Sequence, residues 1–173
     1  MVEMDPSNYG FRTRNHRMVL GTDFDLLMRG RGMIRYDYRF FAHLSMGLMA
    51  GIDWTEMSLY SRFSDKLAKP VPKQFSVLGG VSAKWRLTEW YMHSSVFLEP
   101  SVLFGHMWQD FALTKSNHWR LRPGIFLGGE TVFDSGLSLT LRIGAEFPAD
   151  FGTANPSVEL VEPLLVVGFG LAI

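Results

Sequence analysis

Cysteine is absent from this 173-residue chain. Its absence excludes disulfides, thiolate metal sites and a cysteine nucleophile. Net charge is absent as well, because 17 basic residues balance 17 acidic ones. No overall field therefore draws the chain towards nucleic acid or an acidic partner. The length is that of one domain.

Long apolar runs are also missing. The longest, Pro163 to Ile173, falls well short of the ~20 residues that a transmembrane helix needs. Residues 1–10 are polar and acidic, unlike a secretory signal peptide. We expect an exported chain whose signal peptide has been removed, with residues 1–16 forming an N-terminal periplasmic segment ahead of a barrel over 17–173.

What the sequence does have is apolar and polar residues alternating with a period of two. From Leu44 to Trp54, one face reads Leu, Met, Leu, Ala, Ile, Trp and the other Ser, Gly, Met, Gly, Asp. A helix would scatter these residues around its axis, whereas a strand separates them into two faces. The same pattern predicts eight strands, near 18–28, 33–40, 43–54, 75–86, 91–105, 118–133, 137–147 and 158–173.

The two faces differ sharply in charge. In these registers the apolar face carries a single charged residue, Glu159. The polar face carries acids and bases in nearly equal numbers: Asp23, Asp25, Arg35, Asp37, Arg39, Asp53, Lys84, Arg86, Glu99, Arg120, Arg122, Glu130, Arg142, Glu146 and Glu162. Buried opposite charges must pair, because an unpaired one costs several kcal/mol. The balance therefore predicts a filled, charge-paired interior, whereas a selective pore favours one sign.

Three observations place the apolar face against lipid. The predicted strands reach the ~9–11 residues that a tilted membrane-spanning strand requires. Glycines lie on the polar face, where the lumen of a narrow barrel is crowded. Tryptophans lie at strand ends, as expected for aromatic girdles at the two membrane interfaces. The two predicted girdles are Trp54, Trp108 and Trp119 at one interface, and Trp85 and Trp90 at the other.

The predicted connections alternate in length. Short ones follow the second, fourth and sixth strands, whereas longer ones span 55–74, 106–117 and 148–157. Bacterial barrels place short turns in the periplasm, so both termini are expected there, in a bacterial outer membrane. Proline lacks the donor for a strand ladder, so we expect bulges or shifted registers near Pro100, Pro123 and Pro163.

The long connection 55–74 is rich in basic residues, namely Arg62, Lys66, Lys69 and Lys73. Phosphate groups of lipopolysaccharide are one plausible partner for these cations. A solvated loop at the barrel rim explains them equally well. Residues 1–16 contain two aromatic residues and two arginines beyond Asp5, which suits either docking to a periplasmic protein or a frayed terminus.

Over about residues 17–173 the chain resembles the small eight-stranded outer-membrane proteins of the OmpA/OmpX/OmpW type. The segment 39–48, Arg-Phe-Phe-Ala-His-Leu-Ser-Met-Gly-Leu, looks like a periplasmic hairpin of that family. The ending 166–173, Val-Val-Gly-Phe-Gly-Leu-Ala-Ile, looks like its C-terminal assembly strand, although Ile173 replaces the usual final aromatic residue. The resemblance implies an all-β, antiparallel up-and-down transmembrane barrel, lipid contact, and the barrel-assembly machinery as a partner.

The sequence offers little catalytic chemistry. His93, Ser95 and Glu99 are similar to the set used by lipid A deacylase barrels, but all three point into the predicted lumen, and Val96 breaks the fuller motif. His106 and His118 lack ligand spacing; the alternatives are two histidines that face each other at the rim and two incidental positions. We expect no metal, cofactor or nucleic-acid partner. The favoured function is a non-enzymatic anchor or interaction protein of the cell envelope; the alternatives are a lipid A-modifying enzyme and a soluble lipocalin-like barrel.

Overall fold

The structure, a computed structural model, describes residues 17–25, 30–41, 43–54, 73–90, 94–111, 114–133, 135–152 and 161–173. Its strands are β1 (Met18–Asp25), β2 (Arg31–Phe41), β3 (Leu44–Trp54), β4 (Lys73–Trp90), β5 (Ser94–Phe111), β6 (Thr114–Val132), β7 (Leu137–Glu146), β8 (Ala149–Phe151) and β9 (Glu162–Ala172). Within these ranges, no helix is long and apolar enough to cross a membrane.

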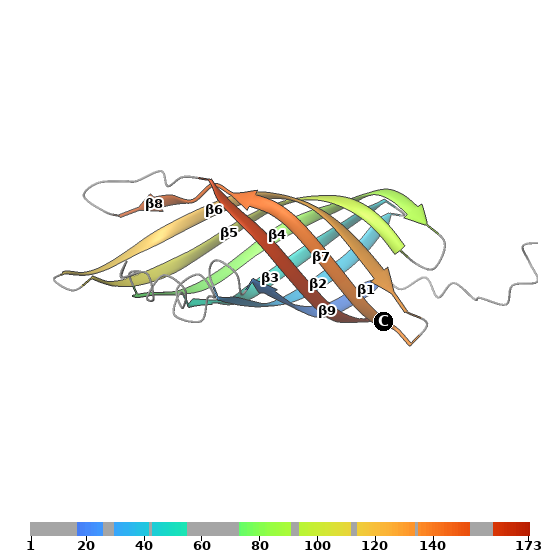
Figure 1. The fold of residues 1–173 in the computed structure, drawn as a ribbon, viewed down its shortest axis with the longest axis horizontal. Coiled ribbons are helices and arrows are strands. Elements are labelled where there is room, and N and C mark those ends of the chain that lie inside the picture. Colours follow the sequence, from blue (N-terminus) through green and yellow to red (C-terminus); the bar gives the residue numbers. More distant parts are fainter. Residues whose placement is uncertain are drawn as a thin grey trace, which may run out of the picture.

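The strands form one closed antiparallel barrel (Figure 1). Neighbours in sequence pair around the wall from β1 to β6, β7 pairs with β6 and β9, and β9 closes on β1. Backbone hydrogen bonds between Met18 and Ile173 bring the two ends of the described chain together, with N···O distances of 3.2 and 2.8 Å. With β7 and β8 counted as one interrupted strand, as explained below, the predicted eight-stranded up-and-down barrel is confirmed.

The short strand β8 continues β7 along the same partner. Glu146 pairs with Gly124 and Ala149 pairs with Leu121, so the register on β6 is unchanged across the gap. Pro148 lies in that gap, and proline has no N–H to give to a ladder. β7 and β8 are therefore one wall strand with an interruption. The predicted loop 148–157 is wrong at its start, because residues 149–151 belong to the wall.

The expected register shifts at prolines are also wrong. Pro100 pairs with Ile125 and Pro163 pairs with Ala145 in uninterrupted ladders, while Pro123 pairs with Val102. On the β4 side, pairing lapses opposite Pro100 but resumes in the same register at Leu98. A missing donor thus removes single hydrogen bonds without moving the strand. The shifts that do occur lie between Arg39 and Phe41 and between Arg86 and Thr88.

The hairpin β5–β6 is longer than predicted. The two strands remain paired to Phe111 and Thr114, so the expected connection 106–117 shrinks to residues 112–113. At the opposite end of β5, β4 extends to Trp90 and β5 begins at Ser94. The connection between them is therefore 91–93, and the predicted turn at 87–90 is wrong. The β5–β6 hairpin reaches beyond the other strands at one end of the barrel, called the tall end below (Figure 1).

Burial alternates along every long strand, with charge inside and apolar side chains outside. On β3, Leu48 is 61% exposed while Asp53 is 2% exposed. On β2, Ile34 is 62% exposed while Arg35 is 6% exposed. A barrel with an apolar exterior and a charged interior reverses the distribution of a soluble barrel, which hides its apolar face. The wall is therefore built to face hydrocarbon.

The interior is not wholly polar, because apolar side chains interlock with glycines across the strands. Met33 pairs with Gly51, which pairs in turn with Leu78. A Cβ added at Gly51 would lie 2.7 Å from the Met33 Cα. Phe126 and Leu164 flank Gly144 in the same way on the opposite wall. Large side chains thus fill the space that the glycines leave, so the filled lumen holds apolar as well as charged side chains.

Candidate functional site

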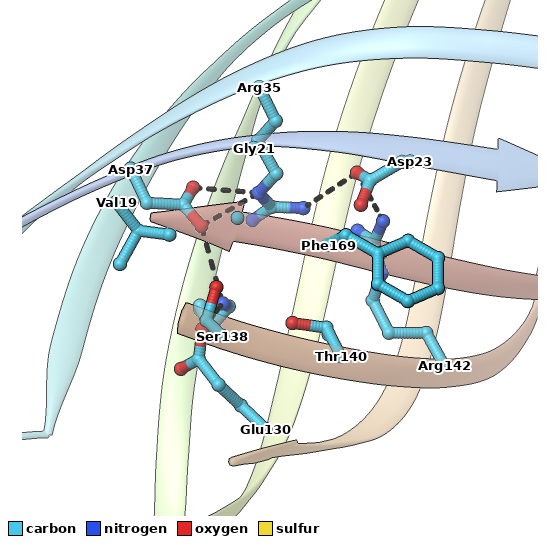
Figure 2. Close-up of a pocket in the computed structure, with 13 residues that line it drawn as sticks. Val19, Gly21, Asp23, Arg35, Asp37, Glu130, Ser138, Thr140, Arg142 and Phe169 are labelled. Atoms are coloured by element: carbon cyan, nitrogen blue, oxygen red, sulfur yellow. Dashed lines mark hydrogen bonds and ion pairs between the residues drawn. The ribbon is translucent and has the colours of Figure 1, made fainter. Parts of the chain in front are cut away.

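The densest chemistry in the molecule is a continuous chain of ion pairs inside the barrel. At its centre, Arg35 donates to Asp37 at 2.8 and 2.7 Å and to Glu99 at 2.6 Å. Arg142 reaches the same Glu99 oxygen at 2.8 Å and also pairs with Asp23. Figure 2 shows Arg35 between Asp37 and Asp23, with Arg142 beyond them. These residues come from β1, β2, β5 and β7, so the series of ion pairs crosses the lumen.

The series of ion pairs continues through residues of β4 and β6. Lys84 Nζ lies 3.2 Å from Asp37 Oδ2 and 3.0 Å from Glu130 Oε1. Arg86 donates to the other oxygen of Glu130 at 3.1 Å and to Ser45 at 2.6 Å. Every side chain in this part of the network is nine-tenths buried or more. Such pairs fix the arrangement of the strands, because removing one partner leaves an uncompensated charge.

Two further groups of ion pairs lie towards the tall end of the barrel. Arg31 holds Glu146 through two hydrogen bonds of 2.5 and 2.9 Å, and lies 3.6 Å from Asp53. Arg122 also pairs with Asp53.

The second group joins β6 to β8. Arg120 pairs with Asp150, its Nη2 donating at 2.7 Å. His118 Nε2 lies 3.3 Å from the same carboxylate. These contacts hold the interrupted strand against the wall.

The interior residues predicted from sequence lie on the inner face. All are buried except Arg39 and Glu162, which are partly exposed at opposite rims. Arg39 lies beside a register shift, where its Nε donates to the carbonyl of Phe41 at 3.4 Å. Arg39 therefore belongs to the rim and not to the buried network.

Sequence reasoning missed three members of the interior. The predicted strand boundaries leave Arg31 in a turn and Asp150 in a loop, and the sequence pattern gives His118 no role inside the barrel. The period of two still contains a signal for the first two, since Arg31 extends the inner face of Arg35, and Asp150 that of Glu146. The prolines concealed the second of these extensions. The alternative in which His106 and His118 face each other is wrong, because His106 lies on the outer face and His118 on the inner one.

The outer face carries a cluster of aromatic side chains near the tall end. Trp119 stacks on Phe104 with ring centroids 5.0 Å apart, and His106 packs edge-on against both Trp108 and Trp119. Phe75 lies 5.6 Å from Trp108. Trp54 is exposed at the same end and Trp85 is 61% exposed towards the other. The side chain of Trp90 lies outside the described residues.

Other sequence candidates have different outcomes. Ser95 and Glu99 are both buried on the inner face, whereas His93 lies outside the described residues. Arg62, Lys66 and Lys69 also lie outside them, as do residues 1–16 and the side chain of Lys73. In the described ranges, no group of histidines and acids has the arrangement of a metal site.

Comparison with known proteins places the fold. No protein-family model matches the chain, and no curated protein matches its sequence. Among solved structures, Neisserial surface protein A superposes with a TM-score of 0.59 at 11% identity, covering 90% of this chain and 93% of that one. The Yersinia pestis outer membrane protein Ail gives a TM-score of 0.46 at 12% identity, covering 90% and 97%.

The chain has the fold of a small outer-membrane β-barrel. The resemblance to the OmpA/OmpX/OmpW type is confirmed at the level of fold. Combined with the apolar exterior, this fold makes the protein a membrane-embedded barrel. The soluble lipocalin-like alternative is wrong, because such a barrel encloses apolar side chains and would not enclose a network of ion pairs.

Proposed function

We propose that the protein is an integral barrel of a bacterial outer membrane and acts as a non-enzymatic anchor or interaction protein of the cell envelope. The observation that carries this proposal is the pairing of an apolar exterior with an interior filled by ion pairs. The apolar exterior suits contact with lipid, and the filled interior suits a structural protein better than a channel. Function then resides at the rims, on the loops and terminal segments.

Both termini are proposed to face the periplasm. Hydrogen bonds between Met18 and Ile173 join the two ends of the barrel wall. The connections at that same end are short, at 42–43, 91–93 and 133–136. This matches the short periplasmic turns of bacterial barrels.

The proposed partners follow from this orientation. Lipid and lipopolysaccharide would surround the wall, with Arg62, Lys66, Lys69 and Lys73 available to phosphate groups outside the cell. The barrel-assembly machinery would insert the chain, and residues 1–16 would be available to a periplasmic protein. None of these partners is a nucleic acid.

Membrane fractionation tests the proposal. The protein, expressed with a signal peptide in a Gram-negative host, should sediment with outer-membrane markers and resist extraction by carbonate. On unheated gels it should migrate as a compact form that heating converts to the unfolded one. Recovery in the soluble periplasmic fraction would overturn the proposal. A cysteine placed at Ser135, in a short turn, should stay unlabelled by an impermeant maleimide in intact cells and react after lysis.

A further inference from the structure

The buried charges of the interior fall into two groups with different balances. Around Arg35, the described part of the chain buries four acids and four bases: Asp23, Asp37, Glu99, Glu130, Arg35, Lys84, Arg86 and Arg142. Towards the tall end it buries four acids but only three arginines: Asp25, Asp53, Glu146, Asp150, Arg31, Arg120 and Arg122. His118 is the other base buried at that end, and it is 4% exposed. A charged His118 makes the second group equal as well.

The contact between His118 and Asp150 depends on the charge of the imidazole ring. His118 Nε2 lies 3.3 Å from Asp150 Oδ1, which is within ion-pair distance. Both ring nitrogens are buried, and neither has a hydrogen-bond partner in the described part of the chain. A neutral ring therefore gains little from the carboxylate and leaves two polar atoms unsatisfied. A protonated ring is attracted to the carboxylate at this distance, so protonation strengthens the contact.

The other groups that face His118 keep their charge near neutral pH. At this level β6 pairs with β5 and β8. β5 presents the uncharged Met107 and Gln109 on its inner face, and β8 presents Asp150. On β6 itself, Arg120 donates to Asp150 from Nη2 at 2.7 Å, and a guanidinium stays charged in proteins. Histidine is the side chain that changes its charge between about pH 5 and 8.

β8 is the element that this contact would control. It has three residues, which pair in the ladder with β6 alone, from Trp119 to Leu121. Pro148 interrupts the wall before it, and Gly152 follows it with a positive φ of 82°. Segments with few ladder hydrogen bonds open locally at a small cost in free energy. The side chain of Asp150 is therefore an important part of what fastens β8 to the wall.

We propose that His118 and Asp150 form a pH-dependent clasp, in which protonation of His118 fastens β8 to β6. Deprotonation weakens this contact while the contact with Arg120 remains, so β8 opens more often as the pH rises. With the termini in the periplasm, as proposed above, the tall end lies outside the cell and the clasp responds to external acidity. The clasp itself does not depend on that orientation, and the experiment below measures it on the purified protein.

The mobility of a nitroxide label on β8 tests the clasp. The chain contains no cysteine, so Phe151→Cys, on the exposed outer face of β8, provides a single labelling site. In micelles, the immobile component of the electron paramagnetic resonance spectrum should grow as the pH falls from about 8 to about 5.5. This range titrates histidine and leaves carboxylates ionised. The same label at Leu48→Cys, on the outer face of β3, is the control and should give a constant spectrum.

Three variants of the labelled protein assign the response. His118→Gln keeps a polar side chain without a titratable charge, and it should abolish the pH response at position 151. Asp150→Asn removes the acid partner and should abolish it too. His106→Gln is the matched control, because His106 lies on the outer face of the same hairpin. This control should respond to pH as the wild type does.

Several results would overturn the inference. A constant spectrum of the label on β8 across this pH range would overturn it without requiring either interior variant to fold. A label that becomes more mobile on acidification would reverse the direction and refute the clasp. A pH response that survives in His118→Gln would assign the titrating group elsewhere, and so would a response that is lost in His106→Gln.

Discussion

Arg35 and Glu99 are 64 residues apart in the chain, yet Arg35 Nη1 lies 2.6 Å from Glu99 Oε1 inside the barrel. The same carboxylate oxygen accepts from Arg142 at 2.8 Å. One acid on β5 thereby joins β2 and β7 across the lumen. Because Glu99 is fully buried, its charge has no access to bulk water, and its role depends on these two guanidinium groups.

Glu99→Ala should lower the free energy of unfolding by about 3–5 kcal/mol, because it leaves Arg35 and Arg142 without their shared carboxylate. Urea titration of the protein in micelles measures the change. Arg39→Ala is the control at the partly exposed rim, where Arg39 donates to the carbonyl of Phe41 and where even an ion pair contributes only about 0–1 kcal/mol. Equal losses in the two variants would show that the buried network does not hold the wall together.

Leu48→Arg should cost roughly 2–4 kcal/mol, because Leu48 lies at mid-strand on the outer face and would bring a charge to the bilayer midplane. Phe41→Arg places the same charge at the end of β2, where the cost near an interface is about 0–1 kcal/mol. Refolding yield in lipid vesicles, read from gel mobility, checks both. Indifference to the change at Leu48 would count against membrane embedding.

Gly144→Ala should destabilise the barrel by about 1–3 kcal/mol, which is typical of overpacking. Its new Cβ would lie 2.6 Å from Phe126 Cδ1 and 2.8 Å from Phe126 Cα. Gly129→Ala is the matched control on the neighbouring strand, because its Cβ meets nothing closer than the Ser95 carbonyl at 3.9 Å. Thermal unfolding in micelles should separate the two variants; similar midpoints would refute the interlocking of glycine with large side chains.

The folded wild type should show no steady conductance in planar lipid bilayers, because ion pairs and apolar side chains fill its lumen. Single-channel recording at both polarities is the measurement, with a known porin as the positive control. A reproducible open level would overturn the filled interior and leave the fold intact.

Deletion of residues 1–14 should leave refolding in detergent unchanged, because β1 begins only at Met18. If the segment docks to a periplasmic protein, the deletion should abolish co-purification of that protein from membranes. Both chains would be purified from the same host and compared by mass spectrometry. Identical sets of associated proteins would remove the segment from the list of functional regions.

The sequence alone determined which way most side chains of the long strands face. A strand turns successive side chains to opposite sides, so the alternation around Leu48 and Met49 separated outside from inside without any knowledge of neighbouring strands. The same rule placed Trp54 and Trp85 on the outer face near strand ends. The one-domain length and the balanced charge then favoured a closed, filled barrel. These conclusions needed local pattern only, which is why they agree with the structure.

Tertiary structure decided where the strands end and which charges meet. Prolines suggested loops and shifted registers, but the ladder on β6 holds β8 in the register of β7 across Pro148. Arg31 and Glu146 are 115 residues apart, and only the closure and stagger of the barrel bring them together. A period of two assigns a face but carries no information about partners across the lumen. The pairing is set by how far each tilted strand slides past the next, and that depends on all the ladders at once.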